Sequence, residues 1–493
     1  MPGFGEQTLT SEQTLWLLLP ELVLLLTGAL TLGLGAIHSL RDRKHWLPYI
    51  TLAGLTAALV ATIALWGCNT RPLLRLSCDP FALAIKMIAL VAMGIVVLAS
   101  AAYVQARSRY QAEFYTLLLL STLAICLSSA ASDLIVIFLA FELLSVASYI
   151  LTGYLRDDRR SAEAAIKYFL YGATVLAMML YGMSWLYGLT GSTDLAGIAA
   201  ALREAEDVLR PVVIPPLILM AAGFAFKVAA VPFHQWAPDA YEGAPTPVAA
   251  FLSVGPVIAG CALIVRVMLT ALPIDLQSLA LDWRTVLTTL ATLTMTVGNL
   301  VALWQRNIRR LLAYSSITQA GYILIGVVAA SPRGITATLF YLTAYTLANL
   351  GAFAAIIAFS SQTGSDVIED YAGLSKRAPP LALALLVCLL SLGGIPPLAG
   401  FIGRLYLLYA AIEAGMLWLA VVGVINSVIS LACYWKVIRA MYLVPSRESS
   451  PLPVTGTLAL ALEFAIIVVL ALGLYPAPFL ELLRSAAMVF FGR

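Results

Sequence analysis

Several ionisable residues lie inside or beside long apolar runs of the chain. A charge at the centre of a bilayer costs about 2.5–3.5 kcal/mol on insertion scales, so each such side chain must face a partner, water or another charge. Carboxylates, lysines and histidines placed in this way are the residue types that relay protons through membranes. The candidates are Lys86, Asp133, Glu142, Lys167, Lys227, His234, Arg404 and Lys436.

Glu142 and Lys227 are the two candidates that lie deepest in their runs. Glu142 has nine residues of its run before it and eleven after it, and Lys227 lies fifteen residues into its run. Neither side chain reaches an interface by extending along its helix. Because a carboxylate that moves relative to a buried lysine changes how tightly the lysine holds its proton, the pair predicts a proton path. Lys167 and His234 would extend this path.

Proline interrupts two of the apolar runs close to a cation. One run reads GFAFKVAAVPFHQWAPD, with Pro232 five residues after Lys227, and the other reads SLGGIPPLAGFIGRLYLL, with two prolines before Arg404. Proline inside a helix removes a backbone hydrogen bond and clashes with the preceding turn. Freed carbonyls at membrane depth are tolerated only beside protein or water. Paired broken helices indicate an ion path in an inverted-repeat transporter, and simple packing kinks are the alternative.

Other charged residues are compatible with a place at a helix end. A side chain there extends to the interface and needs no partner inside the bilayer. This interpretation is as good as a buried role for Lys86, Asp133 and Lys436, and it is favoured for Arg266 and Arg439.

The composition restricts the class of protein. The 493 residues are 61% hydrophobic and 11% charged, with a net charge of +3, whereas soluble domains are about 45–50% apolar and about 25% charged. The mean hydropathy is +0.93. These values exclude a soluble enzyme and a disordered chain. The small, dispersed charge argues against a nucleic-acid partner, and no Gly-rich phosphate loop is present.

Long unbroken apolar runs predict an all-α polytopic membrane protein, because a membrane helix needs about 20 apolar residues. The first run lacks the basic flank and short length of a cleaved signal peptide, so it counts as a helix. Fourteen runs qualify: 14–37, 47–67, 80–104, 112–130, 132–153, 162–189, 212–235, 247–272, 284–304, 311–330, 335–359, 379–410, 415–442 and 456–476.

The charges of the loops predict the orientation of the chain in the membrane. Fourteen lysines and arginines fall in one set of alternate loops and six in the other. By the positive-inside rule, both termini are expected on the non-cytoplasmic side.

Six cysteines without a CxxC pair indicate no zinc or iron–sulfur site. Cys68 and Cys78 flank a loop expected outside, where a disulfide is one alternative.

Several segments together resemble a known family. They read FLAFELLSVASYILTGY, RSAEAAIKY, FKVAAVPFHQWAPDAYEGAPTPVAAFL, RRLLAYSSITQAGY and GGIPPLAGFIGRLY. These segments resemble the antiporter-like membrane subunits of respiratory complex I, an NADH–quinone oxidoreductase, over about Pro20 to Tyr442. The resemblance implies that Glu142, Lys227, Lys167 and His234 match the family's proton-path residues of helices 5, 7, 6 and 7.

The resemblance also implies an architecture and a role. About fourteen transmembrane helices would include two inverted five-helix repeats with discontinuous helices 7 and 12. The chain would divide into 1–110, 111–272, 273–443 and 444–493. It would translocate protons, driven by quinone reduction elsewhere in the complex, and hold no cofactor itself. Quinone, flavin and iron–sulfur clusters would belong to partner subunits of the membrane-embedded complex, in the cell inner (plasma) membrane and its lipid bilayer.

Three positions depart from the family pattern. Val257 stands where helix 8 usually has lysine, Gln319 where helix 10 often has histidine, and Arg404 where helix 12 has lysine. Valine and glutamine do not titrate, and arginine stays charged. Either water and other side chains bridge the gap, or this chain pumps differently, or it pumps poorly. Lys436 is a candidate substitute for the missing titratable group.

Two other functions remain open from the sequence. The same motifs occur in subunits of multi-component sodium/proton antiporters, which have no redox partner, and in membrane-bound hydrogenase-type relatives. The other is a structural spacer that has lost pumping, because Val257 and Arg404 leave fewer titratable residues along the proposed path.

Overall fold

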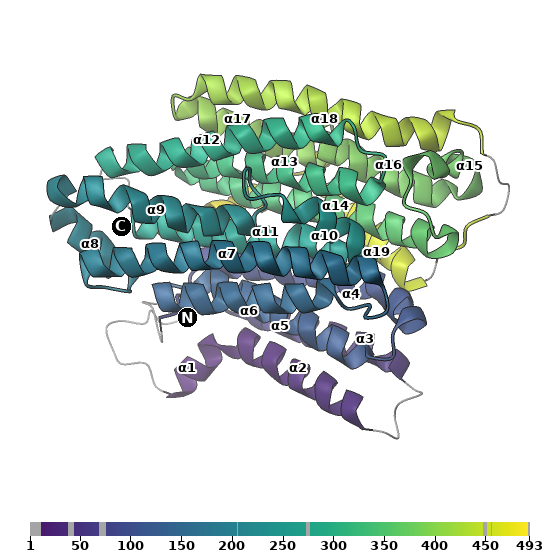
Figure 1. Ribbon diagram of the computed structural model, residues 1–493, viewed down its shortest axis with the longest axis horizontal. Helices are drawn as coiled ribbons and strands as arrows, with labels where there is room; N and C mark the ends of the chain where they lie inside the picture. The colour runs from purple at the N-terminus through teal and green to yellow at the C-terminus, as the bar shows by residue number, and fades with distance from the viewer. Residues whose placement is uncertain are drawn as a thin grey trace.

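The computed structural model is a bundle of α-helices, most of which run roughly along one axis (Figure 1). It describes residues 11–37, 44–68, 75–204, 206–272, 277–446, 451–454 and 456–491. Twelve helices among these residues are long and apolar enough to cross a membrane. The predicted all-α polytopic class is confirmed. The twelve are α2 (Leu19–Ala36), α3 (Leu47–Ala64), α4 (Pro80–Arg107), α5 (Gln111–Ala130), α6 (Leu134–Thr152), α7 (Arg159–Thr190), α11 (Thr246–Thr270), α12 (Gln277–Ala302), α13 (Ile308–Val328), α14 (Pro332–Thr363), α18 (Leu417–Leu443) and α19 (Gly456–Leu474).

The remaining helices complete the described chain. They are α1 (Ser11–Leu17), η2 (Lys44–Trp46), α8 (Leu195–Glu204), α9 (Glu206–Lys227), α10 (Trp236–Gly243), η3 (Ile368–Tyr371), α15 (Leu374–Arg377), α16 (Pro379–Gly393), α17 (Ala399–Glu413), α20 (Ala477–Ala487) and η4 (Met488–Phe490). Twelve long helices and two interrupted ones, α9–α10 and α16–α17, account for the fourteen predicted runs.

The first interruption begins earlier than the position of its proline suggests. α9 ends at Lys227, and residues 228–235 form turns before α10 begins at Trp236. The amide of Ala229 donates to the carbonyl of Phe226 at 3.1 Å, which tightens the last turn of the helix. The backbone of Ala229 lies in the left-handed region, with a φ of 55°, so the chain leaves the helix before it reaches Pro232.

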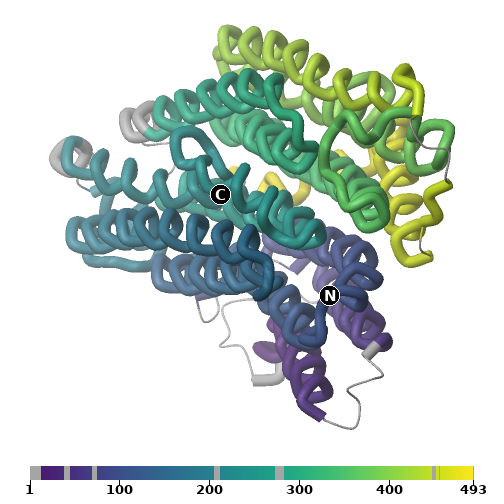
Figure 2. The backbone as a smooth tube through the Cα atoms, turned by 45° about the vertical axis from the view of Figure 1, so that its right-hand side comes forward, coloured from purple at the N-terminus to yellow at the C-terminus, as the bar shows by residue number. Residues whose placement is uncertain are grey.

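Three helices form the centre of the bundle. The most apolar part of α11 is 100% buried, and α13 and α14 are each 94% buried, against 33% for α7 and 39% for α18. The N-terminal helices and α18 lie at opposite edges (Figure 2). Outer helices expose large apolar side chains such as Leu26 and Val428. Such a surface suits lipid or neighbouring apolar subunits.

Arg266 forms a buried ion pair, so the helix-end prediction for this residue is wrong. Its Nη1 and Nη2 atoms donate to the Asp79 carboxylate at 2.6 and 3.1 Å, and Nη2 also donates to the Ser129 carbonyl at 2.7 Å. Asp79 also caps α4 by accepting a bond from the Ala82 amide at 2.8 Å. The Arg266 side chain stays inside because its counter-ion is held at the start of the neighbouring helix α4.

Lys86 and Asp133 lie in different places in the fold, one inside a helix and the other at a helix start. Lys86 is buried and pairs with Glu21 of α2, with the Nζ and Oε1 atoms 2.5 Å apart. Its helix-end interpretation is therefore wrong. Asp133 caps α6 by accepting a bond from the Ile135 amide at 2.8 Å and pairs with Arg75. Asp133 therefore lies at a helix end, as this interpretation requires, but its side chain is buried and paired and does not extend to the interface.

The two cysteines around the predicted outer loop are free thiols. The disulfide alternative is therefore not the state of this structure. Cys68 and Cys78 nevertheless lie close enough to share a hydrogen bond, which lowers the pKa of the Cys68 thiol and raises that of Cys78. Cys68 is half-buried, and the other five cysteines are buried.

We expect Arg266→Met to destabilise the protein, because the substitution leaves the buried Asp79 carboxylate without its counter-ion. Breaking a buried pair costs about 3–5 kcal/mol. Thermal unfolding of the purified assembly measures the loss. The control is Asp79→Asn combined with Arg266→Met, which retains a capping side chain on α4 and removes both charges. This double variant should unfold at a higher temperature than Arg266→Met, and equal unfolding temperatures would contradict the analysis.

Candidate functional site

Lys227, the last residue of α9, is held against α6 next to Glu142. Its side chain is 1% exposed. The Nζ atom donates to the Ser145 hydroxyl at 2.8 Å and to the Phe141 carbonyl at 3.2 Å. It also lies 4.0 Å from the centre of the Phe141 ring, within the range of a cation–π contact. The ammonium is thus bound by Phe141, the residue directly before Glu142, and by Ser145, three residues after it.

Glu142 stays unpaired beside this lysine. Its Oε2 atom is buried and has no hydrogen-bond partner. No ion pair of Glu142 is found within the described ranges, although Lys227 is bound on the same stretch of α6. A half-buried carboxylate near a buried ammonium, without direct contact, can form or release an ion pair through a small shift of either side chain. This is the arrangement that a proton relay needs.

The break after Lys227 is satisfied by the protein itself. The Trp236 indole donates at 3.1 Å to the Phe226 carbonyl, which also accepts the Ala229 amide, and the Val231 amide donates to the Thr294 hydroxyl of α12 at 3.0 Å. Trp236 in turn stacks on the Tyr168 ring of α7 with 4.1 Å between ring centres. These contacts hold the irregular segment that carries Lys227 at its start.

His234 and Lys167 are placed differently from each other. His234 lies in the break, half-buried, and its Nδ1 atom is buried without a hydrogen-bond partner. Lys167 is exposed on α7 and pairs with Glu163 at 2.8 Å and with Asp239 at 2.9 Å. His234 therefore lies within the interruption between α9 and α10. Lys167 contacts α10, beyond the interruption, through its ion pair with Asp239.

Asp239 is the centre of a polar network between α7, α10 and α13. It accepts bonds from Lys167 at 2.9 Å and from Arg310 at 2.8 Å, and Arg310 also binds Glu242 at 2.8 Å. The bonds to the two cations stabilise the charged form of the Asp239 carboxylate. The network therefore keeps Asp239 charged.

Arg404 of α17 binds the carbonyls that the second break frees. The guanidinium is 3% exposed. Its Nη1 atom donates to the Gly393 carbonyl at 2.9 Å, and its Nη2 atom donates to the Leu392 carbonyl. Both carbonyls belong to the last turn of α16, whose C-terminal end carries the negative end of the helix dipole. Arg404 thus stabilises the interruption from the following helix.

The rest of the Arg404 environment is polar but uncharged. The guanidinium donates to the Tyr341 hydroxyl at 3.0 Å, to the Ser427 hydroxyl at 3.1 Å and to the Gln319 carbonyl oxygen at 3.2 Å, and it lies 4.5 Å from the Tyr322 ring centre. No carboxylate pairs with it in the described part of the chain. Gln319 takes part as a hydrogen-bonding residue, which a non-titrating side chain can do.

The region between the two breaks contains hydroxyl and amide groups beside Val257. Tyr345 donates to the Ser253 carbonyl at 2.5 Å, and Asn349 donates to the Ser253 hydroxyl at 2.6 Å. The Thr346 hydroxyl and the Asn349 carbonyl oxygen are buried without a protein partner. Buried polar atoms of this kind are usually satisfied by ordered water.

Lys436 does not join the Arg404 cluster. Its Nζ atom donates to the Gln305 carbonyl at 2.6 Å, just beyond the end of α12. Ser430, which contacts Arg404 at 3.4 Å, precedes it by six residues on α18. That spacing is about 9 Å along a helix. In this structure Lys436 stabilises a helix end.

Sequence reasoning missed some of the polar partners. Glu21, the partner of Lys86, was visible as an acid in the first apolar run, LPELVLLL. Tyr322 and Tyr341 gave no signal, because a tyrosine in an apolar run reads as an ordinary core residue. Within the described ranges, no group of three His, Cys, Asp or Glu side chains is arranged to hold a metal ion.

Comparison with known proteins identifies the chain's relatives. The family model described as "NADH:quinone oxidoreductase/Mrp antiporter, TM" matches residues 131–430. The chain is 41% identical to the NADH-quinone oxidoreductase subunit N of Heliobacterium modesticaldum, over 96% of this chain and 99% of the relative.

Solved structures share the fold. A chain of respiratory complex I from Thermus thermophilus superposes with a TM-score of 0.80 at 32% identity, covering 94% of this chain and 99% of that one. A chain of the Mrp complex from Dietzia sp. DQ12-45-1b gives a TM-score of 0.82 at 24% identity, covering 98% of each. The second likeness shows the fold alone.

We expect Arg404→Met to lower the thermal stability of the assembly, because it removes the side-chain donor of the buried Gly393 carbonyl and leaves the Leu392 carbonyl with the Gln319 amide alone. Each unsatisfied buried group costs about 1–3 kcal/mol. Arg404→Lys should have an intermediate effect, since one ammonium cannot reproduce the forked guanidinium contacts. Thermal unfolding of the parent and both variants tests the order. Unchanged stability of Arg404→Met would show that water replaces the guanidinium.

Proposed function

The chain belongs to the NADH:quinone oxidoreductase/Mrp antiporter membrane family, and we propose that it is a proton-translocating module of an NADH–quinone oxidoreductase membrane arm. The observation that carries this proposal is the half-buried Glu142, whose buried Oε2 atom has no partner, beside the buried Lys227 at a helix break. Burial penalises both charges, so a structural role alone would favour a closed ion pair or apolar side chains. The open arrangement supports a pair that exchanges protons.

Lys227 would hold the translocated proton. When the Glu142 carboxylate approaches, its charge stabilises the ammonium, and when it withdraws, the desolvated ammonium releases its proton more readily. His234 has an unpartnered nitrogen in the adjoining segment and can accept a proton there. Quinone reduction in partner subunits would drive the cycle, and flavin and iron–sulfur clusters would also belong to partners. This chain would be a non-redox subunit.

The middle of the path would depend on water. Val257 offers no proton, but Ser253, Thr346 and Asn349 place hydroxyl and amide groups beside it. Waters bound to such groups can bridge titratable residues. Arg404 would act as a fixed charge, because its guanidinium keeps its proton and is held by neutral dipoles.

The segments LPELVLLLTGAL and FELLSVASYILTGY and the basic Arg404 favour subunit N among the antiporter-like subunits. The relative from Heliobacterium modesticaldum, which carries that name, supports this assignment. The paired interruptions at α9–α10 and α16–α17 support the proposed repeats at 111–272 and 273–443. The chain is a multi-pass membrane protein, and we propose the cell inner membrane, with both termini on the non-cytoplasmic side.

A multi-component sodium/proton antiporter subunit is the second candidate, favoured by the fold shared with the Mrp complex. Mass spectrometry of the assembly purified in mild detergent separates the two. Quinone-site and iron–sulfur partners support the proposal, whereas small membrane partners without a redox protein contradict it.

We expect Lys227→Met and Glu142→Gln each to reduce proton translocation strongly, by about tenfold or more, because a positioned acid–base group contributes about 10²–10⁴-fold to proton transfer. The measurement is the pH gradient formed by inverted membrane vesicles during oxidation of the complex's electron donor. Assembly is checked on native gels.

Lys376→Met is the matched control, since Lys376 is exposed on α15, outside the proposed path. It should translocate protons like the parent. Normal translocation in both site variants, with normal assembly, would identify the chain as a structural spacer.

Cys68 gives a test of sidedness. In the proposed orientation the end of α3 faces the non-cytoplasmic side, so a membrane-impermeant maleimide should label Cys68 in right-side-out vesicles and spare it in inverted ones. The lowered pKa predicts labelling at a lower pH than for an ordinary thiol, because the thiolate is the reactive form. Cys68→Ala should abolish the label. Labelling only in inverted vesicles would reverse the proposed orientation.

A further inference from the structure

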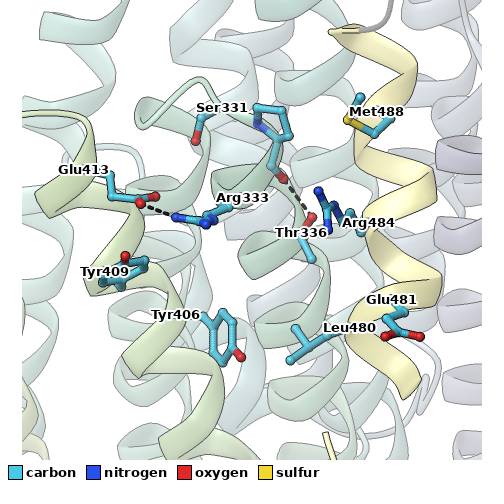
Figure 3. Close-up of a pocket in the computed structure, with 11 residues that line it drawn as sticks. Ser331, Arg333, Thr336, Tyr406, Tyr409, Glu413, Leu480, Glu481, Arg484 and Met488 are labelled. Atoms are coloured by element: carbon cyan, nitrogen blue, oxygen red, sulfur yellow. Dashed lines mark hydrogen bonds and ion pairs between the residues drawn. The ribbon is translucent and has the colours of Figure 1, made fainter. Parts of the chain in front are cut away.

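A pocket of about 710 Å³ lies between the start of α14, the end of α17 and α20 (Figure 3). None of its lining residues belongs to the proposed proton path. Its volume falls within the 300–1,000 Å³ typical of sites for small molecules. The pocket therefore has room for a ligand unrelated to the relay.

The pocket lies at the level where helices end. α14 begins at Pro332 and α17 ends at Glu413, so this part of the molecule belongs near a membrane–water interface. Tyr406 and Tyr409 line the pocket and are 40% and 50% exposed. Tyrosines gather at the depth of lipid headgroups, where the ring is in an apolar layer and the hydroxyl is wet.

The walls carry two cations and two anions. Arg333 pairs with Glu413, and its guanidinium lies 5.6 Å from the centre of the Tyr409 ring. Arg484 and Glu481 line the opposite wall on α20, and neither forms an ion pair with any residue that the structure describes (Figure 3). Two charges of opposite sign thus remain available to a ligand.

The start of α14 adds a positive potential. Ser331 caps this 32-residue helix by accepting a bond from the Gly334 amide at 3.1 Å. The N-terminal end of a long helix carries a partial positive charge that favours anions. With the guanidinium of Arg484 facing it across the pocket, this end of the pocket suits a phosphate group.

We propose that this pocket binds one membrane phospholipid whose headgroup carries both a phosphate and an ammonium. The Arg484 and Arg333 guanidiniums would bind the phosphate, and the Glu481 carboxylate would bind the ammonium. Tyr406 and Leu480 would contact the glycerol and the first methylenes of the acyl chains. The balanced charge of the walls matches a zwitterionic headgroup better than an acidic protein segment, and the bilayer supplies such headgroups at this depth.

The test uses the intact multi-subunit assembly, purified in mild detergent and stripped of lipid. Synthetic phosphatidylethanolamine, phosphatidylglycerol or inorganic phosphate is added back, and native mass spectrometry counts what is bound. We expect one tightly bound phosphatidylethanolamine in the parent, with affinity at least about tenfold lower in Arg333→Gln/Arg484→Gln, since both charge-assisted bonds to the phosphate are lost. Glu481→Gln should remove the preference over phosphatidylglycerol.

Arg107→Gln is the matched control, because Arg107 is also exposed and lies 4.1 Å from the centre of a tyrosine ring, that of Tyr103. It should bind lipid like the parent. Equal lipid binding by the double arginine variant would overturn the proposal. Displacement of lipid by inorganic phosphate would assign the pocket to a free anion, and loss of a neighbouring subunit with unchanged lipid would assign it to a protein contact. Both outcomes would also overturn the proposal.

Discussion

Backbone carbonyls that a helix break frees inside a bilayer need donors from the protein, because lipid offers none. Both interrupted helices meet this need with side chains from nearby elements. Trp236 donates to the Phe226 carbonyl after α9, and Arg404 donates to the Leu392 and Gly393 carbonyls after α16. The positions of the buried cations, and hence of the charged axis, depend on these breaks.

The two halves meet the same constraint with different chemistry. In the first half an indole, backbone amides and a threonine hydroxyl serve the break, and the cation at its start, Lys227, binds α6 beside Glu142. In the second half the cation itself is the donor, and Arg404 has a shell of hydroxyls, an amide and carbonyls. The first half is therefore suited to exchange a proton, and the second to hold a permanent charge.

Polar groups of α11 and α14 lie between the two halves. Buried Ser253 and Asn349 bond to each other, and Thr346 keeps an unpartnered hydroxyl near Asn349 on α14. A fixed positive charge at Arg404 raises the electrostatic cost of a second positive charge nearby, since Coulomb interactions are strong at low dielectric. In the proposed function Arg404 would therefore act as a fixed charge on the path without relaying protons itself.

The sequence by itself determined the fold class, the number of runs and the deep placement of Glu142 and Lys227, because apolar length and charge position are local properties of the chain. It also located both interruptions through their prolines. Only the tertiary structure decided which groups meet. The Arg266–Asp79 and Lys86–Glu21 pairs join residues far apart in the chain, and so does the Arg404 shell of Tyr341, Gln319 and Ser427. Helix packing, rather than spacing along one helix, brings these partners within hydrogen-bond reach.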